Sequence, residues 1–286
     1  LTELVECLAA CGIKAGWLEE TVLHENEASR RQICRAFIAA DLVLVAGHPG
    51  AASAELWLGN GPSGPSPSES RSDSRFFCAD QRELASCTDA LARWLRRCSD
   101  LTPVWGCVLI GGRSSRMGHP KHLLTGSDGR TWLEHTVERL RPFVAGCVIS
   151  GGGIVPDTCQ DLERISDLPG VVGPLAGIGA VVRQRPWTSW LVLACDLPDV
   201  SSPAIAWLLQ QRRVGTVAVI PVNPVNGYSE PLFAWYDFRC APLLDDLLAG
   251  DMLRISSLRG HPAVHQPSIP LDLCGAWRNV NRVEEL

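Results

Sequence analysis

Short apolar runs alternate with helix-type patterns over most of the chain. Apolar runs of strand length occupy residues 41–47, 104–110, 145–150 and 190–195. Glycine, proline or charged residues bound these runs, which is typical of strands buried inside a parallel sheet. Apolar residues at helical spacing occupy residues 80–97, 131–140 and 173–180. Strands that alternate with helices predict an α/β fold with a doubly wound, mostly parallel sheet, whose site lies at the carboxyl ends of the strands.

Two domains are expected, because the N-terminal third has an α/β pattern of its own. A smaller α/β domain covers residues 1–100, and the larger domain covers residues 103–286, after a short polar linker at 99–103. Residues 59–75 consist almost entirely of Gly, Ser, Pro and charged residues, so we expect a flexible loop there. The other elements predicted for the smaller domain are helices and strands at residues 1–10, 29–40, 41–47, 76–78 and 80–97.

Composition narrows the classes of function. The 286 residues are 46% hydrophobic and 20% charged, which suits a globular core. A net charge of −5 without a long basic run argues against nucleic acid as a partner, and no apolar stretch is long enough to cross a membrane. Twelve scattered cysteines form no CxxC pair, so we expect free thiols in a cytoplasmic protein rather than a zinc site.

The apolar run at residues 104–110 opens into a glycine-rich, cationic loop. Such a loop suits phosphate, because glycines let backbone N–H groups approach the anion while hydroxyl and cationic side chains add donors and charge. The loop lacks the GxxxxGK[ST] pattern, because His119 follows Gly118, and its glycine spacing excludes GxGxxG. Its polar, cationic and glycine residues are Gly111, Gly112, Arg113, Ser114, Ser115, Arg116, Gly118 and Lys121.

This loop resembles GGxSxRMGxxK, the signature of the molybdenum cofactor nucleotidyltransferases within the sugar-nucleotidyltransferase-like superfamily. Four further segments resemble that family in the same order: GPLAG from Gly173, CDLP with Asp196, EPL with Glu230, and NVN near the C-terminus. The resemblance covers residues 104–286. It implies an enzyme that transfers GMP from GTP to the phosphate of molybdopterin and releases pyrophosphate, with Mg²⁺ as the metal ion.

The resemblance also implies roles for individual residues. Asp196 would bind the metal ion, Lys121 would neutralise the α-phosphate, and Arg116 would stabilise the departing pyrophosphate. A carboxylate that directly follows a strand suits Mg²⁺ on chemical grounds as well. The small residues of GPLAG are explained nearly as well by packing as by nucleotide contact. The residues expected to contact nucleotide or pterin are Leu109, Ile110, Gly111, Gly112, Ser114, Ser115, Gly118, Asp167, Gly173, Pro174, Glu230, Asn279 and Asn281.

The choice of base rests on the same resemblance. Gly111-Gly112 and Cys195-Asp196 match the guanylyl branch of the family, whereas the cytidylyl branch reads LAAG and GDxP. The alternatives are a CTP-dependent molybdopterin enzyme, a sugar-phosphate nucleotidyltransferase, and a non-catalytic nucleotide-binding scaffold in cofactor assembly. The chain departs from the family pattern at Ile110, where Ala is usual, and at residues 282–283, where Thr-Pro is usual.

The smaller domain resembles a truncated form of the MobB-like GTP-binding adaptor. The shared features are a helix, the DLVLVAG strand, a polar loop, a short strand and a final helix ending in ARWL. The phosphate loop of that family, GxxGxGKT, is absent, so no GTPase residue is carried over. A decayed molybdopterin-binding domain and a structural α/β extension remain as alternatives. The expected protein partners are a GTP-binding adaptor or an apo-molybdoenzyme.

Overall fold

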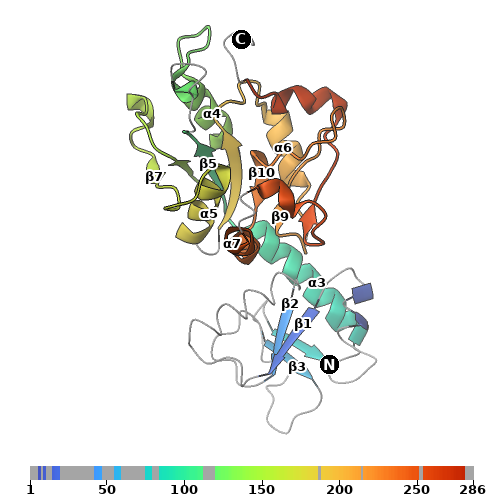
Figure 1. Cartoon of the computed structure of the whole chain (residues 1–286). Helices are drawn as coiled ribbons and strands as arrows, with labels where there is room; N and C mark the ends of the chain where they lie inside the picture. Colours follow the sequence, from blue (N-terminus) through green and yellow to red (C-terminus); the bar gives the residue numbers. More distant parts are fainter. Residues whose placement is uncertain are drawn as a thin grey trace. The chain divides into compact units, whose positions relative to one another are not determined.

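The chain divides into two compact units, Leu1–Leu101 and Thr102–Leu286, and each is described by itself. None of the helices that the structure describes is long and apolar enough to span a membrane. The computed structural model (Figure 1) describes residues 6–7, 9–10, 15–19, 42–46, 55–58, 75–78, 84–111, 120–185, 188–213, 215–250 and 254–280.

In the first unit, the described residues include two pairs of parallel strands and the helix α3 (Leu84–Leu101). Strand β1 (Ala15–Glu19) pairs with β2 (Leu42–Ala46), and β3 (Glu55–Leu58) pairs with β4 (Arg75–Cys78). Helix α3 contacts β4. The strands predicted at 41–47 and 76–78 are confirmed as β2 and β4. Strands β1 and β3 were missed because neither contains a β-branched residue, so neither has a typical strand composition.

Two boundaries in this unit differ from the sequence-based expectation. Arg75, the last residue of the predicted flexible loop, is the first residue of β4, and residues 59–74 lie outside the described residues. Helix α3 continues to Leu101, so the linker predicted at 99–103 was wrong for its first three residues. Leu95, Cys98 and Leu101 follow one another at a spacing of three, which continues the helical pattern. The helix predicted at 29–40 lies outside the described residues. Within the helix predicted at 1–10, the residues that the structure describes are helical.

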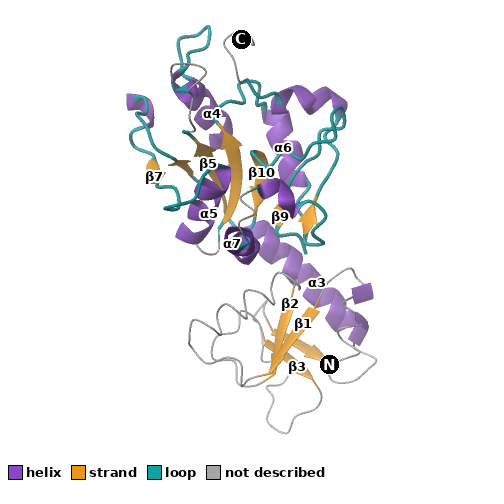
Figure 2. Cartoon of the chain, viewed as in Figure 1, coloured by secondary structure: helices purple, strands orange, loops and turns teal. Residues whose placement is uncertain are grey.

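The second unit is built on a seven-stranded sheet with the order β11-β9-β10-β8-β5-β6-β7. Figure 2 draws the strands in orange. Among the described strands of this sheet, β10 alone runs antiparallel to its neighbours, which confirms the predicted mostly parallel α/β sheet. The strands are β5 (Val104–Leu109), β6 (Cys147–Ser150), β7 (Glu163–Ile165), β8 (Ser189–Ala194), β9 (Ala218–Val219), β10 (Phe233–Tyr236) and β11 (Val264–His265).

Helices cover both faces of this sheet because successive strand residues point to opposite faces. Leu193 of β8 shares a buried cluster with Val137 of α4 and Ile205 of α6. Trp190 and Val192 alternate with Leu193 and are fully buried on the other face, where α5 packs. The helices are α4 (Trp132–Leu140), α5 (Pro174–Gln184), α6 (Ser202–Gln210) and α7 (Ala241–Ala249), and α7 packs against α5.

The local sequence explains where α4 and α5 begin. Thr131 and Glu134 form a reciprocal capping box, in which the Glu134 carboxylate accepts from the Thr131 N–H at 2.7 Å. Pro174 occupies the first helical position of α5, where a missing N–H has no cost. Both helices were predicted from the sequence, and the structure confirms them.

The connections of the sheet place several chain segments at one edge. From the central strand β5, the chain adds β6 and β7 on one side and then crosses to add β8 on the other. The carboxyl ends of these parallel strands, Leu109, Ser150, Ile165 and Ala194, therefore lie at the same edge of the sheet. Such a switch point is where ligands bind in open α/β sheets.

Gly151, directly after β6, meets a requirement that only glycine satisfies. Its φ is +111°, and an added Cβ would lie 1.9 Å from the Ile110 carbonyl oxygen. We expect Gly151→Ala to lower the free energy of unfolding by about 3 kcal/mol or more, from backbone strain and the steric clash together. Gly152→Ala is the matched control, because an added Cβ there meets nothing within 4 Å. Urea unfolding of both variants measures the difference, and equal midpoints would contradict the expectation.

Candidate active site

The predicted phosphate loop begins at the carboxyl end of β5. The Ile110 N–H donates to the Ser150 carbonyl at 2.8 Å, which joins the start of the loop to the end of β6. Leu109 is half-buried, Ile110 is buried and Gly111 is exposed, with a φ of +105°. Residues 112–119 lie outside the described residues, and among them are the predicted Gly112, Ser114, Ser115, Arg116 and Gly118.

Lys121 and Asp196 form an ion pair across this edge. Lys121 is the first residue of the short 3₁₀ helix η2 (Lys121–Leu123), and Asp196 follows β8 by two residues. The Lys121 Nζ lies 2.9 Å from the Asp196 Oδ2, and the two side chains are 17% and 18% exposed. Partial burial excludes most water from the pair, so the attraction is stronger than at an exposed surface. The structure thus brings together two residues that are 75 positions apart in the chain.

The second carboxylate oxygen of Asp196 is buried without a hydrogen-bond partner among the described residues. A buried acceptor without a partner costs free energy, and a bound cation removes that cost. The described residues contain no group of three or more His, Cys, Asp or Glu side chains that could hold a metal ion by themselves. One carboxylate oxygen beside a phosphate loop suits Mg²⁺, which keeps several waters and binds through one or two carboxylates together with substrate phosphates.

Asp167 and GPLAG approach the same edge from β7 and α5. The Ser150 hydroxyl donates to the Asp167 Oδ1 at 3.2 Å. An added Cβ at Gly177 would lie 2.8 Å from Leu109 Cδ2 and 2.9 Å from Ser150 Oγ, so close packing requires a glycine there. Gly173 has a φ of +89° and is exposed together with Pro174. Packing therefore explains Gly177, whereas exposed Gly173 and Pro174 can contact a ligand.

The EPL and NVN segments also reach this edge. The Ala194 N–H donates to the Leu232 carbonyl at 2.8 Å, which places the EPL segment beside the end of β8. The Val280 N–H donates to the Asp196 carbonyl at 3.0 Å, so exposed Asn279 lies next in the chain to a residue that contacts the Asp196 turn. Asn281 lies outside the described residues.

A family model described as the MobA-like NTP transferase domain matches residues 106–264, more than half of the chain. The chain belongs to this family. As a MobA-like protein it is a nucleotidyltransferase, and the predicted family and enzyme class are confirmed. The seven-stranded sheet described above is thus the sheet of a nucleotidyltransferase fold.

Curated relatives of this MobA-like chain have names from molybdenum cofactor biosynthesis. A probable molybdenum cofactor guanylyltransferase from Bacillus mycoides is 32% identical over 139 residues, which are 47% of this chain and 68% of the relative. A molybdenum cofactor biosynthesis bifunctional protein from Synechocystis is 31% identical over 140 residues. That match spans 47% of this chain but only 39% of the length of the bifunctional protein.

A solved structure agrees with this assignment. It is the structure of molybdopterin-guanine dinucleotide biosynthesis protein A from Archaeoglobus fulgidus, which is 26% identical. The superposition has a TM-score of 0.51 and covers 63% of this chain and 94% of the other. The similarity therefore extends over nearly the whole of the Archaeoglobus protein.

Cys195, next to Asp196 in the MobA-like CDLP motif, is a buried neutral thiol. Burial, and then the neighbouring Asp196 carboxylate, raise the pKa of Cys195 to about 12. The thiol therefore remains protonated at neutral pH and packs as a small apolar residue. Cys107, Cys147, Cys159 and Cys240 are, like Cys195, free and buried.

Residues that sequence reasoning missed hold the segments around Lys121. His122 is 2% exposed, and its Nε2 donates to the Ile154 carbonyl at 2.8 Å. Arg164 donates to the carbonyls of Gly151 and Gly153 at 2.9 and 2.8 Å. The two side chains hold the glycine loop after β6 beside η2. The only sequence signal was the position of His122 directly after the motif lysine.

Glu230 of the EPL segment is half-buried and titrates near neutral pH. Burial raises the pKa of Glu230 from its ordinary value of 4.5 to about 7, and a hydrogen bond with the Asn223 side chain opposes that shift. Between these two pH values the unfolded chain has lost the proton that the folded protein still binds. The free energy of unfolding attributable to Glu230 therefore decreases as the pH rises through this range.

We expect Glu230→Gln to flatten the pH dependence of stability between pH 4.5 and 7. The amide has no proton to lose, so the decrease caused by Glu230 disappears. Urea unfolding of wild type and variant at several pH values measures the slope, with Asp161→Asn at an exposed position as the control. Parallel pH profiles for wild type and Glu230→Gln would contradict the assignment.

Proposed function

We propose that the chain transfers GMP from GTP to the terminal phosphate of molybdopterin, forming a guanine dinucleotide and pyrophosphate. Membership of the MobA-like family and the guanylyltransferase names of its relatives support this reaction. The GG and CD residues of the guanylyl branch, Gly111-Gly112 and Cys195-Asp196, support GTP as the nucleotide. The observation that carries the proposal is the Lys121–Asp196 pair, with its unpartnered carboxylate oxygen, at the edge where the phosphate loop begins.

In the proposed reaction, an oxygen of the molybdopterin phosphate attacks the α-phosphorus of GTP. The bond from the α-phosphorus to the bridging oxygen breaks, and pyrophosphate leaves with that electron pair. The attacking phosphate is already an anion, so no general base is required. Catalysis then consists of positioning the two substrates and neutralising charge.

Lys121 and Arg116 supply that positive charge in the proposal. The Lys121 ammonium, held by Asp196, faces the α-phosphate, where negative charge increases as the new bond forms. Arg116, in the phosphate loop, binds the β- and γ-phosphates and stabilises the departing pyrophosphate. The unpartnered Oδ1 of Asp196 would hold a divalent cation such as Mg²⁺, which supplies further charge neutralisation between the phosphates.

The remaining residues position the substrates. In the proposal, Leu109, Ile110, Gly111 and the loop residues Gly112, Ser114, Ser115 and Gly118 contact the nucleotide, together with Asp167, Gly173 and Pro174. Glu230, Asn279 and Asn281 contact the pterin. A carboxylate or an amide oxygen suits the hydrogen-bond donors of a pterin edge.

A competition experiment tests the base and the acceptor together. Equal concentrations of GTP and CTP are supplied with Mg²⁺ and molybdopterin, and the pterin product is identified by mass spectrometry. The expected product is the guanine dinucleotide. A cytosine product would overturn the base. In a second reaction, mannose 1-phosphate replaces molybdopterin, and transfer to it would overturn the acceptor. Nucleotide binding without any product would favour the non-catalytic scaffold.

A further inference from the structure

The turn that carries Asp196 is held by backbone hydrogen bonds on two sides. The Cys195 N–H donates to the Leu109 carbonyl at 3.1 Å, and the Val280 N–H donates to the Asp196 carbonyl at 3.0 Å. These bonds fix the turn where it leaves β8. The far end of the turn, at Pro198, is held by a side chain from another element.

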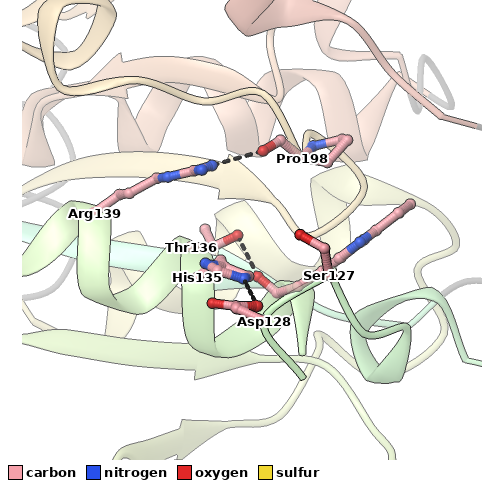
Figure 3. A pocket seen from close by; sticks show the side chains of 8 residues that line it. Ser127, Asp128, His135, Thr136, Arg139 and Pro198 are labelled. Carbon is pink, nitrogen blue, oxygen red and sulfur yellow. Dashed lines mark hydrogen bonds and ion pairs between the residues drawn. The ribbon is translucent and has the colours of Figure 1, made fainter. Parts of the chain in front are cut away.

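Arg139 of α4 provides this third attachment. Its Nη1 donates to the Pro198 carbonyl at 2.6 Å, as Figure 3 shows. The two residues are 59 positions apart in the chain. Among the described residues, Arg139 forms no ion pair with a carboxylate, whereas Arg130, Arg183 and Arg185 each do. The charged guanidinium of Arg139 therefore donates to a backbone carbonyl, and hydrogen bonds from charged donors are stronger than those from neutral donors.

The contact crosses a solvent-open cleft instead of a packed core. Arg139 and Pro198 both line a cleft of about 330 Å³, together with Ser127, Asp128 and His135 (Figure 3). Water can reach the Pro198 carbonyl if the guanidinium is removed, so no buried acceptor is left without a partner. Loss of the contact therefore loosens the turn without exposing apolar core.

The position of the turn matters because the Asp196 side chain is held at one of its two oxygens only. Its Oδ2 pairs with Lys121, while its Oδ1 is buried without a partner among the described residues. A movement of the Asp196–Pro198 backbone is therefore transmitted directly to the free carboxylate oxygen.

We infer that Arg139 is a positioning residue, which acts through the Pro198 carbonyl to hold the Asp196 carboxylate in place for a divalent cation and the nucleotide phosphates. Arg139 touches neither substrate nor metal ion in this account. The inference rests on the proposed function, because it takes Asp196 as the residue that holds the cation.

The test compares Arg139→Met with Arg141→Met. Met keeps the length of the apolar stem but removes the guanidinium, and Arg141 is an exposed arginine two residues further along the chain.

Mn²⁺ binding in the presence of GTP, without acceptor, is measured by electron paramagnetic resonance. We expect Arg139→Met to weaken Mn²⁺ binding about tenfold, as for loss of one charged hydrogen bond. In steady-state assays we expect a similar decrease in kcat with KM for GTP within about twofold. Arg141→Met is expected to match wild type.

Arg139→Lys separates positioning from a general structural role. It keeps one charged donor, so we expect Mn²⁺ binding between wild type and Arg139→Met, and it carries the comparison if Arg139→Met does not fold. Mn²⁺ affinity and kcat within twofold of wild type for Arg139→Met would overturn the inference, as would losses that only follow a lowered melting temperature. If wild type itself neither binds Mn²⁺ with GTP nor releases pyrophosphate, the proposed function fails first, and the inference fails with it.

Discussion

Asp196→Asn lowers kcat for pyrophosphate release by about 10²–10³-fold, the range found when one preorganised charge or donor is removed from an active site. The amide keeps the size of the side chain, and its oxygen can still accept a hydrogen bond from Lys121 Nζ, which lies 2.9 Å from the carboxylate. The negative charge is lost, and the position of Oδ1 is taken by an NH2 group, which cannot bind a cation. Because the buried Oδ1 is the unpartnered atom, the loss falls on the group proposed to hold the cation.

The matched control for this variant is Asp199→Asn. Asp199 lies three residues further along the chain, is exposed, and pairs with Arg278 at the surface. The same chemical change there removes a charge of the same sign near the same turn. We expect Asp199→Asn to keep kcat within about twofold of wild type, since exposed ion pairs contribute little. Equal losses in both variants would show that net charge, and not the Asp196 carboxylate, controls the rate.

We expect Lys121→Met to lower kcat by about 10²–10³-fold as well, because it removes the ammonium proposed to face the α-phosphate. It also leaves the Asp196 carboxylate, which is 18% exposed, without the Lys121 ammonium 2.9 Å away. The two residues act as a unit, so the double variant Lys121→Met/Asp196→Asn should lose far less than the product of the two single losses. Multiplicative losses would show that the residues act independently.

Lys121→Arg tests whether charge alone is sufficient at this position. The chain contains two lysines, Lys14 and Lys121, beside 24 arginines, so lysine is the rarer of its two basic residue types. A guanidinium is planar and larger than the compact ammonium ion. We expect Lys121→Arg to recover only a minor part of kcat. Full activity in Lys121→Arg would show that positive charge alone is sufficient at this position.

The local pattern predicted three neighbouring strands of the seven-stranded sheet, β5, β6 and β8, but not its margins. The runs that became β5, β6 and β8 are almost entirely apolar and are followed by glycine or a charged residue, so their burial could be predicted directly. Strands β1 and β3 of the first unit were missed because neither contains a β-branched residue. Helix α3 passes its predicted end because Cys98 and Leu101 continue the helical spacing.

The motifs predicted candidate site residues, but not how these residues interact. The sequence could place Asp196 at a strand end and Lys121 in the loop that follows another strand, yet the 2.9 Å contact between them depends on tertiary packing over 75 residues. The sequence left open whether the small residues of GPLAG serve packing or nucleotide contact. The packing of Gly177 is visible only in the structure, because its close neighbours Leu109 and Ser150 lie on strands distant in the sequence. Arg139 and Arg164 were not predictable, since side chains that hold backbone carbonyls leave no spacing pattern.

The most direct test of nucleotidyl transfer at this site is pyrophosphate release from GTP and Mg²⁺ by the wild-type chain, with and without molybdopterin. The account predicts release only when molybdopterin is present, with one pyrophosphate for each pterin consumed. No release in the presence of molybdopterin, or release that does not depend on it, would contradict the account.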